Sequence, residues 1–360
     1  MYRILIAAGG TGGHLYPGMV LGHELRKRGC KTAFICRKND SSKAILANNK
    51  FRFFEIDFHG FPRKLSLRLF SFCYLFTGSV ITSYKIITSF KPDAVVGMGG
   101  YISFPVIIAA ALKRIPVVIH EQNSIPGLAN RLLKYFASKI AVSFEDSEKF
   151  FPKSKTIFTG NPVRQDIFTT IPEEAYKALN LDPKRVTLFV FGGSQGAAKL
   201  NQVVIDTLPL LDEYRAKVQF IHITGKLDGE KARIEKGYAK HGFKATVLPY
   251  LDRIGLAYTA ADLIICRAGA TTISELMIVH KPAILVPFPY ATANHQQLNA
   301  LNMVKKGNAI MIKEKDLTPP ILSGGLIIYI ASLKRSSHKV NLPKHLPQYY
   351  LANTVLEQAQ

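Results

Sequence analysis

The sequence predicts an α/β protein of two Rossmann-like domains, whose parallel sheets face one another across a cleft. Three observations support this fold class. A chain of 360 residues is long for one ordinary domain. Each half opens with a buried apolar strand, a glycine-rich turn and a helix, first at residues 3–28 and again at residues 186–202. Further apolar strands follow in both halves at the spacing of strand–helix–strand units.

The first half predicts an open parallel sheet. Its first strand covers residues 3–8, a glycine-rich turn follows, and a helix runs from about Pro17 to Arg28. Helical patterns separate the next strands from one another. These strands are predicted at residues 31–36, 93–100 and 116–123.

The second half repeats this organisation after Asn161-Pro162. Its strands are predicted to begin at residue 186 and to continue at residues 219–225, 245–251, 262–269 and 282–289. We therefore expect a first domain over residues 1–163, a second over 164–340 and a C-terminal segment over 341–360. Ligands of such folds bind at the carboxyl ends of the strands, so we expect the cleft there.

The charge balance predicts an anionic partner. Lys and Arg number 47 against 25 Asp and Glu, which leaves a formal net charge of +22 on the chain. A field of this sign attracts nucleic acid or anionic lipid. No zinc-finger, homeodomain or RRM signature is present, so we expect no nucleic acid partner. The four cysteines lack metal-ligand or redox spacing and no secretory signal precedes the first strand, which predicts a cytoplasmic location.

An uncharged apolar run at residues 69–84 permits two interpretations. It is too short to span a bilayer, so it forms either a buried core helix or a helix at a membrane interface. Basic residues flank it and favour the second interpretation. They are Arg63, Lys64, Arg68, Lys85 and Lys91. A second uncharged run, at residues 317–333, contains two prolines and two glycines and is too broken for a transmembrane helix.

Two glycine-rich turns are candidate phosphate sites. A turn between a strand and a helix brings backbone N–H groups close to a phosphate, and the helix N-terminus adds positive potential. The first turn, Gly9-Gly10-Thr11-Gly12-Gly13, does not fit the dinucleotide pattern G-x-G-x-x-G, so NAD binding is disfavoured. The second turn, Gly192-Gly193-Ser194-Gln195-Gly196, adds the hydroxyl of Ser194.

A third candidate site is the segment CRAGATTISE, residues 266–275. Small residues open a helix there, and the N–H groups of its first turn can hold a diphosphate. Glu275 lies one turn further on. Its carboxylate either complements the helix dipole or accepts hydrogen bonds from the two hydroxyls of a ribose.

Seven motifs occur in a fixed order along the chain up to about residue 317: GGTGGH, GMGGY, HEQN, NPVR, GGSQGA, CRAGATTISE and HQQ. With them the chain resembles the bacterial lipid II-forming N-acetylglucosamine transferases. The resemblance implies a GT-B fold, a final helix that crosses back to the first domain, and a peripheral place on the cytoplasmic face of the inner membrane. It also implies inverting transfer from UDP-GlcNAc to the 4-hydroxyl of the lipid I muramoyl sugar, a step of peptidoglycan synthesis.

The resemblance also implies the site residues. The acceptor side comprises His14, Tyr101, Glu121 and Asn130, with His14 as the general base and Glu121 as its alternative. No metal or cofactor is expected, because no DxD-like pair accompanies the donor motifs. The donor UDP-GlcNAc would contact Thr11, Gly12, Gly13, Asn123, Arg164, Ser194, Leu251, Ala270, Thr271, Thr272, Ile273, Ser274, Glu275, Gln296 and Gln297.

Three other functions remain open at this point. A transferase of the same fold that glycosylates diacylglycerol is the nearest, although the HEQN and HQQ motifs argue against it. A UDP-GlcNAc 2-epimerase shares the fold and the donor but needs no lipid acceptor. A non-catalytic binder of lipid head groups or nucleic acid is suggested by the charge alone.

Overall fold

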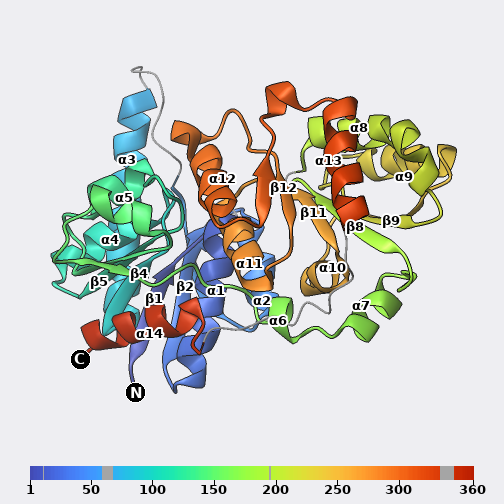
Figure 1. Cartoon of the computed structure of the whole chain (residues 1–360). Coiled ribbons are helices and arrows are strands. Elements are labelled where there is room, and N and C mark those ends of the chain that lie inside the picture. Colours follow the sequence, from blue (N-terminus) through green and yellow to red (C-terminus); the bar gives the residue numbers. More distant parts are fainter. Residues whose placement is uncertain (11, 59–67, 194–195, 333–343) are drawn as a thin grey trace. The chain divides into compact units, whose positions relative to one another are not determined.

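Figure 1 shows the computed structural model of the chain, in which residues 1–10, 12–58, 68–193, 196–332 and 344–360 are described. The chain divides into two compact units. Unit 1 comprises Met1–Arg164 with Pro343–Gln360, and unit 2 comprises Gln165–Leu342. Each unit has its own parallel sheet covered by helices, so the alternation of strands and helices expected in both halves is present in both.

The sheet of unit 1, as far as the chain is described, has the strand order β3-β2-β1-β4-β5-β6-β7, and all its neighbouring strands pair in parallel. The order reverses between β1 and β4, which is the point where open α/β sheets place their ligands. The strands are β1 Arg3–Ala7, β2 Lys31–Arg37, β3 Arg52–Ile56, β4 Ala94–Gly97, β5 Val117–Glu121, β6 Lys139–Val142 and β7 Thr156–Phe158.

Helices cover both faces of this sheet, because successive side chains of a strand point to opposite faces. Ile4 and Ile6 belong to one hydrophobic cluster with residues of α1 and α14, whereas Leu5 and Ala7 belong to another with residues of α3 and α4. The helices of unit 1 are α1 Gly12–Lys27, α2 Ser42–Asn48, α3 Arg68–Phe90, α4 Ser103–Leu112, α5 Leu128–Leu133, the 3-10 helix η1 Glu145–Phe150, and α14 Pro347–Gln358.

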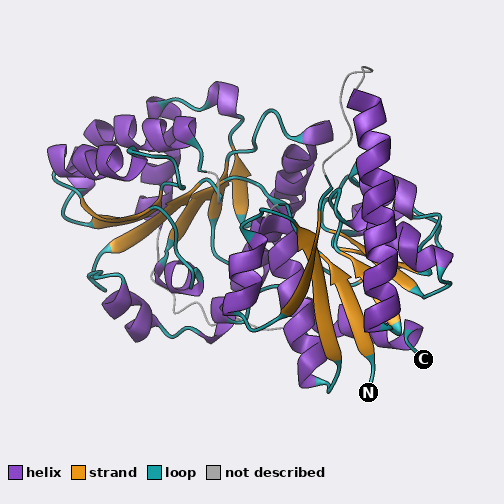
Figure 2. Ribbon diagram, turned by 180° about the vertical axis from the view of Figure 1, so that it is seen from behind, coloured by secondary structure: helices purple, strands orange, loops and turns teal. Residues whose placement is uncertain are grey.

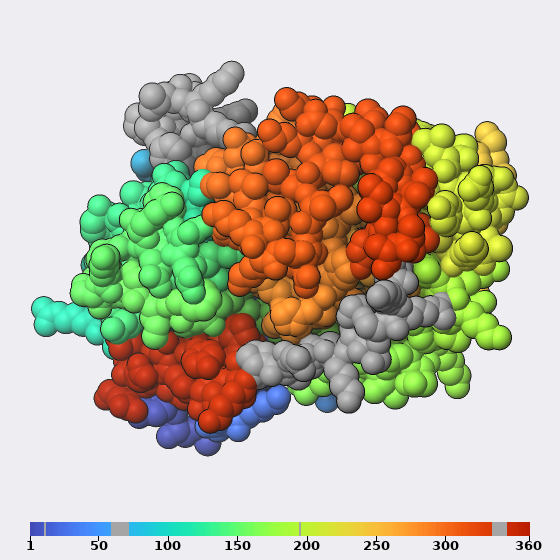
Figure 3. Space-filling model, viewed as in Figure 1, coloured from blue at the N-terminus to red at the C-terminus, as the bar shows by residue number. Residues whose placement is uncertain are grey.

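The last helix, α14, belongs to unit 1 although unit 2 precedes it in the chain. Leu351, Ala352 and Val355 are fully buried in the cluster that contains Ile4 and Ile6. Arg28, which follows α1, donates to the side chain of Asn353, and its guanidinium lies 4.5 Å from the ring centre of Tyr349. In Figure 3 the dark red residues of this segment form part of the surface beside the blue N-terminal residues.

The sheet of unit 2, counted over the same described ranges, has the strand order β10-β9-β8-β11-β12-β13, again parallel throughout. Its strands are β8 Val186–Phe191, β9 Val218–Ile223, β10 Lys244–Leu248, β11 Leu263–Cys266, β12 Ala283–Leu285 and β13 Ala309–Met311. Its helices are α6 Asp166–Thr169, α7 Pro172–Ala178, α8 Ala198–Thr207, α9 Glu230–Lys240, α10 Gly255–Ala260, α11 Ala270–Val279, α12 His295–Lys305 and α13 Pro319–Ser332, with the 3-10 turns η2 Leu208–Tyr214, η3 Thr292–Asn294 and η4 Glu314–Asp316.

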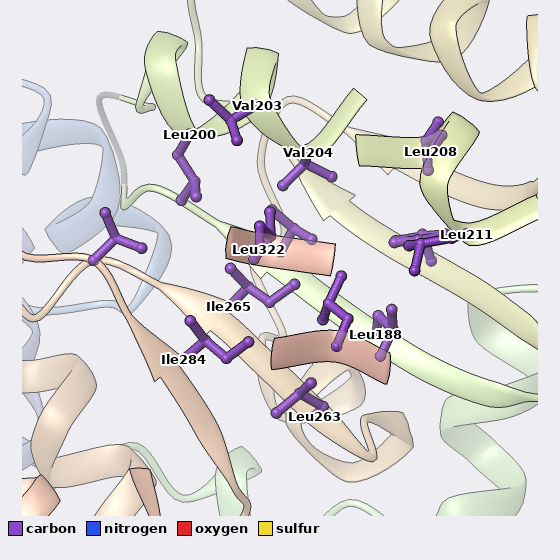
Figure 4. Packing of buried hydrophobic residues seen from close by; sticks show 14 of the residues in the cluster. Leu188, Leu200, Val203, Val204, Leu208, Leu211, Leu263, Ile265, Ile284 and Leu322 are labelled. Carbon is purple, nitrogen blue, oxygen red and sulfur yellow. The ribbon is translucent and has the colours of Figure 1, made fainter. Parts of the chain in front are cut away.

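One face of this second sheet carries the main core of unit 2. Leu188 of β8, Leu263 and Ile265 of β11 and Ile284 of β12 point toward α8 and α13, as Figure 4 shows. Leu322 of α13 is fully buried among them. The other face packs differently, because Phe189 of β8 contacts the ring of Tyr258 in α10 edge-on at 5.6 Å.

Helix α13 forms from the uncharged run that the sequence marks as broken by prolines and glycines. Pro319 and Pro320 lie in its first turn, where a missing N–H leaves no helical bond unmade. Gly324 and Gly325 lie inside it, and burial of Leu322 and Leu326 on the strands offsets their low helix propensity. Residues 333–343, which complete the segment before α14, lie outside the described residues.

Some element boundaries differ from the predicted ones. Helix α1 begins at Gly12 instead of near Pro17, so His14 lies in its first turn and Pro17 lies inside the helix. The glycines of the motif adopt helical angles as easily as turn angles, which the sequence pattern does not reveal. Strand β4 ends at Gly97, because Gly99 and Gly100 have φ angles of +84° and +71° and leave the extended region.

The apolar run at residues 69–84 lies in α3, and its two faces differ. Ser79, Ser83 and Ile87 are buried against the sheet and α4, whereas Tyr74 and Ile81 are 80% and 51% exposed. Figure 2 shows the first turns of α3 extending beyond the strands of unit 1. No helix among the described residues is long and apolar enough to cross a membrane.

Candidate active site

The carboxyl edge of the sheet in unit 1 carries most of the expected acceptor-side residues. His14 follows β1, Tyr101 follows β4, and Glu121 ends β5. These three strands are neighbours, so the loops that leave them meet at one edge of the sheet. Arg164 follows β7 in the same unit, and its guanidinium lies 4.8 Å from the ring centre of Tyr16 in α1.

The first glycine turn is held by a carboxylate that the sequence analysis does not identify. Asp40, in the loop after β2, accepts a hydrogen bond from the backbone N–H of Gly10 at 2.7 Å. It also accepts one from the N–H of Ser42 at 3.1 Å. Burial alone would raise the pKa of Asp40, but these bonds stabilise the charged form and bring it below its ordinary value. Gly12 and Gly13 open α1 beside this turn, and Thr11 lies outside the described residues.

The imidazole of His14 lies against the backbone of the GMGGY motif. A Cβ atom added to Gly99 or Gly100 would come within 3.2–3.3 Å of the ring, close enough that the ring would have to shift by a few tenths of an ångström. The Nδ1 atom lies 3.1 Å from Oε1 of Gln122. The ring is partly buried, in a position that its neighbours in the loops after β4 and β5 define.

Glu121 is 2% exposed and takes hydrogen bonds on both of its carboxylate oxygens. Oε1 accepts from the backbone N–H of Asn123 at 2.9 Å and from its side chain at 3.3 Å. Oε2 accepts from the N–H of Gly127 at 3.1 Å and from Nδ2 of Asn130 at 2.9 Å. Burial raises the pKa of Glu121 even though these bonds oppose the shift. The carboxylate therefore organises the turn from β5 to α5.

The other residues expected in unit 1 differ in exposure. Tyr101 is 52% exposed, whereas Asn130 is 2% exposed and also donates to the carbonyl oxygen of His120 at 3.0 Å. Asn123 is partly buried. The structure thus places Tyr101 at the surface and Asn130 inside the turn that Glu121 organises.

In unit 2 the donor motifs follow the strands β8, β10, β11 and β12. Since β10, β9, β8, β11 and β12 are successive neighbours in one parallel sheet, these loops leave the same edge. The glycine turn follows β8, and Ser194 and Gln195 of this turn lie outside the described residues. Leu251 is partly buried in the loop after β10, and α11 and α12 follow β11 and β12.

Helix α11 begins directly after β11 and presents the first-turn N–H groups of Ala270, Thr271 and Thr272. Its N-cap residue, Gly269, has extended angles and offers no side chain to occupy those groups. The hydroxyl of Thr271 is buried without a hydrogen-bond partner among the described groups. Ile273 and Ser274 are buried, and Ser274 bonds to the carbonyl of Ala270 at 3.0 Å. This helix start suits an anion.

Glu275 is 3% exposed and accepts a hydrogen bond from the hydroxyl of Tyr258 at 2.8 Å. Tyr258 lies in α10 and is fully buried. Gln296 and Gln297 are both partly buried in the first turn of α12. The side-chain oxygen of Gln296 accepts from the N–H of Phe288 at 2.9 Å, which fixes the loop after β12.

Gly196, in the second glycine turn, is expected to tolerate no side chain. Its φ is +76°, and a Cβ atom would lie 2.5 Å from the carbonyl oxygen of Thr224 at the end of β9. Gly196→Ala should therefore lower the free energy of unfolding by at least about 2 kcal/mol, measured by urea denaturation. The control is Gly193→Ala, where φ is +89° but the space is open, and only about 1 kcal/mol should be lost. Equal losses would contradict the close approach of the turn to β9.

Several residues of the two edges were not identified from the sequence alone. Asp40 and Tyr258 act through partners at distant positions, 30 and 17 residues away in the sequence. Arg267 donates to the carbonyl oxygens of Val286 and Pro287 and to Glu314, and so ties β11 to β12. Gln122 and Arg267 stand inside quoted motifs, HEQN and CRAGATTISE, but neither was given a role.

The chain matches two domain families. Residues 4–142 match the glycosyltransferase family 28 N-terminal domain, and residues 187–338 match the C-terminal domain of the same family. Among curated proteins, it is 38% identical over 361 residues to the UDP-N-acetylglucosamine--N-acetylmuramyl-(pentapeptide) pyrophosphoryl-undecaprenol N-acetylglucosamine transferase of Halothermothrix orenii, covering 98% of this chain and 97% of that protein. It is 42% identical over 318 residues to the protein of the same name from Syntrophus aciditrophicus, covering 88% and 86%.

Two solved structures share the fold over almost the whole chain. The MurG of Acinetobacter baumannii superposes with a TM-score of 0.76 at 26% identity, covering 99% of this chain and all of that one. A UDP-GlcNAc 2-epimerase from Neisseria meningitidis superposes with a TM-score of 0.70 at 14% identity, covering 99% of this chain, and shows likeness of fold alone. Together with the two parallel sheets, these matches confirm the predicted α/β fold class of GT-B type.

Proposed function

Because this chain belongs to the family of UDP-N-acetylglucosamine--N-acetylmuramyl-(pentapeptide) pyrophosphoryl-undecaprenol N-acetylglucosamine transferases, we propose that it transfers N-acetylglucosamine from UDP to lipid I. The product is lipid II, the precursor of peptidoglycan. The observation that carries this proposal is the likeness over 98% of the chain to a relative of that name. The seven motifs of the resemblance provide a candidate residue for each step of the reaction.

The donor binds at the carboxyl edge of unit 2. The N-terminus of α11 and the second glycine turn with Ser194 hold the diphosphate, since free N–H groups and a helix dipole favour negative charge. Glu275 accepts the ribose hydroxyls, Leu251 offers its backbone to uracil, and Gln296 and Gln297 contact the sugar. Thr11, Gly12, Gly13, Asn123 and Arg164 complete the donor contacts from unit 1.

The reaction is an inverting displacement. The 4-hydroxyl of the muramoyl sugar attacks C1 of GlcNAc from the face opposite UDP, and the C1–O bond to the diphosphate breaks as the new bond forms. Nε2 of His14 takes the hydroxyl proton. The N–H groups at the start of α11 stabilise the charge that develops on the departing UDP. The carboxylate oxygens of Glu121 already accept hydrogen bonds from Asn123 and Asn130 in the turn after β5. We therefore give Glu121 a structural role on the acceptor side, where Asn130 and Tyr101 also lie, and leave the proton to His14.

A membrane-facing surface lies on unit 1. The acceptor carries a polyprenyl chain that stays in the bilayer, so this unit docks on the anionic cytoplasmic leaflet as a peripheral protein. Tyr74, Ile81 and Tyr84 of α3 are exposed, and so are Leu112 of α4 and Leu128 and Leu132 of α5, which supports this docking. The helices α3, α4 and α5 are neighbours in Figure 1. Of the flanking basic residues, Lys85 and Lys91 are exposed, whereas the side chains of Arg63, Lys64 and Arg68 lie outside the described residues.

The variant Tyr74→Ser/Ile81→Ser should bind anionic vesicles about tenfold more weakly, because each side chain loses apolar area that the membrane would bury. Vesicle co-sedimentation measures the change. The matched control is Ile321→Ser/Ile328→Ser, which removes two exposed apolar side chains from α13 of unit 2 and should leave binding unchanged. Turnover of a water-soluble acceptor analogue should stay the same in both variants. Equal losses in the two double variants would contradict a docking surface on α3.

The reaction itself is tested by UDP release from UDP-GlcNAc with and without lipid I. Release that depends on lipid I, with a disaccharide lipid as product, is the expected result. Release without any acceptor would instead indicate an epimerase, and release with diacylglycerol a glycolipid transferase. Salt-sensitive binding to an oligonucleotide without UDP release would indicate a non-catalytic binder.

A further inference from the structure

Behind His14 lies a chain of hydrogen bonds that the proposed reaction does not yet use. Gln122, the residue after β5, is 2% exposed, and its side-chain amide contacts both His14 and His120. His120 lies in β5 and is fully buried. The three side chains therefore connect the site edge of unit 1 with the interior of its sheet.

The orientation of the Gln122 amide follows from its partners. Its Nε2 atom lies 2.8 Å from the carbonyl oxygen of Met98, 2.9 Å from Nδ1 of His120 and 3.3 Å from the carbonyl oxygen of His120. The two carbonyl oxygens can only accept hydrogen bonds, so the NH₂ group must be on this side. The amide oxygen, an acceptor, then faces Nδ1 of His14 at 3.1 Å.

His120 fixes the other end of this chain. Its Nε2 lies 3.1 Å from the carbonyl oxygen of Gly160, which can only accept, so Nε2 carries the hydrogen. Burial lowers the pKa of His120 to about 4, so the ring is neutral near pH 7. A neutral ring with hydrogen on Nε2 has a lone pair on Nδ1, which accepts the second N–H of Gln122.

From this geometry we infer that Gln122 is a positioning residue that holds the hydrogen of neutral His14 on Nδ1 and leaves the lone pair on Nε2. The inference rests on the proposed function in one respect: Nε2 is the atom that takes the proton of the attacking hydroxyl. The amide oxygen of Gln122 cannot donate, so the opposite tautomer would place two lone pairs face to face. Gly99 and Gly100, in the loop after β4, add to this because their backbone lies close to the ring.

The tautomer can be read without any activity. Long-range ¹⁵N–¹H spectra of protein labelled in its histidines, recorded near pH 9 where an ordinary histidine of pKa ~6.5 is neutral, distinguish Nδ1–H from Nε2–H. The signals of His14 are those that His14→Gln removes. We expect the Nδ1–H form in the parent and a mixture of both forms in Gln122→Met, which keeps the length of the side chain but not its hydrogen bonds.

A matched control loses a buried amide elsewhere. Gln219 in β9 is fully buried, and its amide makes three hydrogen bonds: it accepts from the backbone N–H of Asp182 and donates to the backbone oxygen of Asp182 and to the hydroxyl of Thr187. Gln219→Met should leave the tautomer of His14 unchanged, even though it loses a comparable number of bonds.

Rates give the second readout. Gln122→Met should lower the single-turnover rate about tenfold or more at saturating donor with little change in donor affinity, because part of the His14 population presents the wrong nitrogen. In a His14→Gln background the same substitution should change the rate less than about twofold, since nothing remains to be oriented. A merely structural role would lower the rate equally in both backgrounds.

The Nε2–H form in the parent protein would overturn the inference, and so would an unchanged Nδ1–H form in Gln122→Met. The first of these measurements needs no variant at the Gln122 position, so it stands even where Gln122→Met does not fold. The Nδ1–H form together with a normal rate for His14→Gln would leave Gln122 as the residue that sets the tautomer and remove His14 as the base. Failure of the proposed base is thereby separated from failure of the inference.

Discussion

His14→Gln should lower the rate of the chemical step by about a hundredfold or more while donor binding changes little. Glutamine keeps a polar side chain in the first turn of α1 but cannot take a proton at neutral pH. The ring of His14 occupies a slot between Gln122 and the backbone of Gly99 and Gly100, so its position is defined before any substrate binds. Single-turnover measurement with saturating UDP-GlcNAc isolates this step from product release.

The control for this substitution lies on the same helix. His23 is exposed in α1, with its ring 4.6 Å from that of Phe51. His23→Gln makes the same chemical change without touching the edge of the sheet, and its rate should match the parent. If the rate of His14→Gln stayed within a few-fold of the parent rate, the general base would be Glu121 or water instead of His14.

Glu275→Ala should weaken UDP binding by about 1.5–3 kcal/mol, which is roughly a 10- to 150-fold rise in Kd. The loss comes from the charge-assisted hydrogen bonds of its carboxylate to the two ribose hydroxyls. Isothermal titration calorimetry with UDP measures it, because UDP lacks the transferred sugar and reports on this half of the donor alone.

Tyr258→Phe supplies the control for Glu275. It removes the hydroxyl that donates to the carboxylate at 2.8 Å but keeps the carboxylate itself. We expect lower stability and nearly unchanged affinity for UDP in Tyr258→Phe. Glu275→Ala should lower stability and affinity together. If both variants lose stability and neither loses affinity, Glu275 only braces α11 against α10.

The sequence predicts where the loops of the site begin, because an apolar run followed by glycines shows locally where a strand ends. The motif after β8 and the start of α11 could be identified in this way. The hydrogen-bond partners of the site residues could not be predicted, because they depend on which strands become neighbours in the sheet. Asp40 reaches Gly10 across 30 residues and Gln122 reaches His14 across 108. Nothing in the local pattern around these residues marks either contact.

Burial also changes the interpretation of residues inside the motifs. Glu121 was a candidate base because it stands in HEQN, and the structure adds that four N–H groups already bond to its carboxylate. Its neighbour Gln122 received no role, although its amide contacts His14 directly. Glu121 ends β5 and bonds within the turn that follows, whereas Gln122, just past the strand, bonds back to Met98, His120 and His14. Motif membership does not show which face each residue occupies.

The place of α14 has a consequence for how the chain folds during synthesis. The apolar surface on α1 and on the strands β4, β5 and β6 that α14 covers belongs to unit 1, yet the ribosome makes all of unit 2 before it makes α14. During synthesis, part of the core of unit 1 therefore stays exposed until α14 is made. The contact between Arg28 and Asn353 joins residues 325 positions apart in the sequence. Such long-range closure is slow, and the exposed apolar surface makes aggregation of the nascent chain a risk. The core of unit 1 is therefore completed by residues that are translated after all of unit 2.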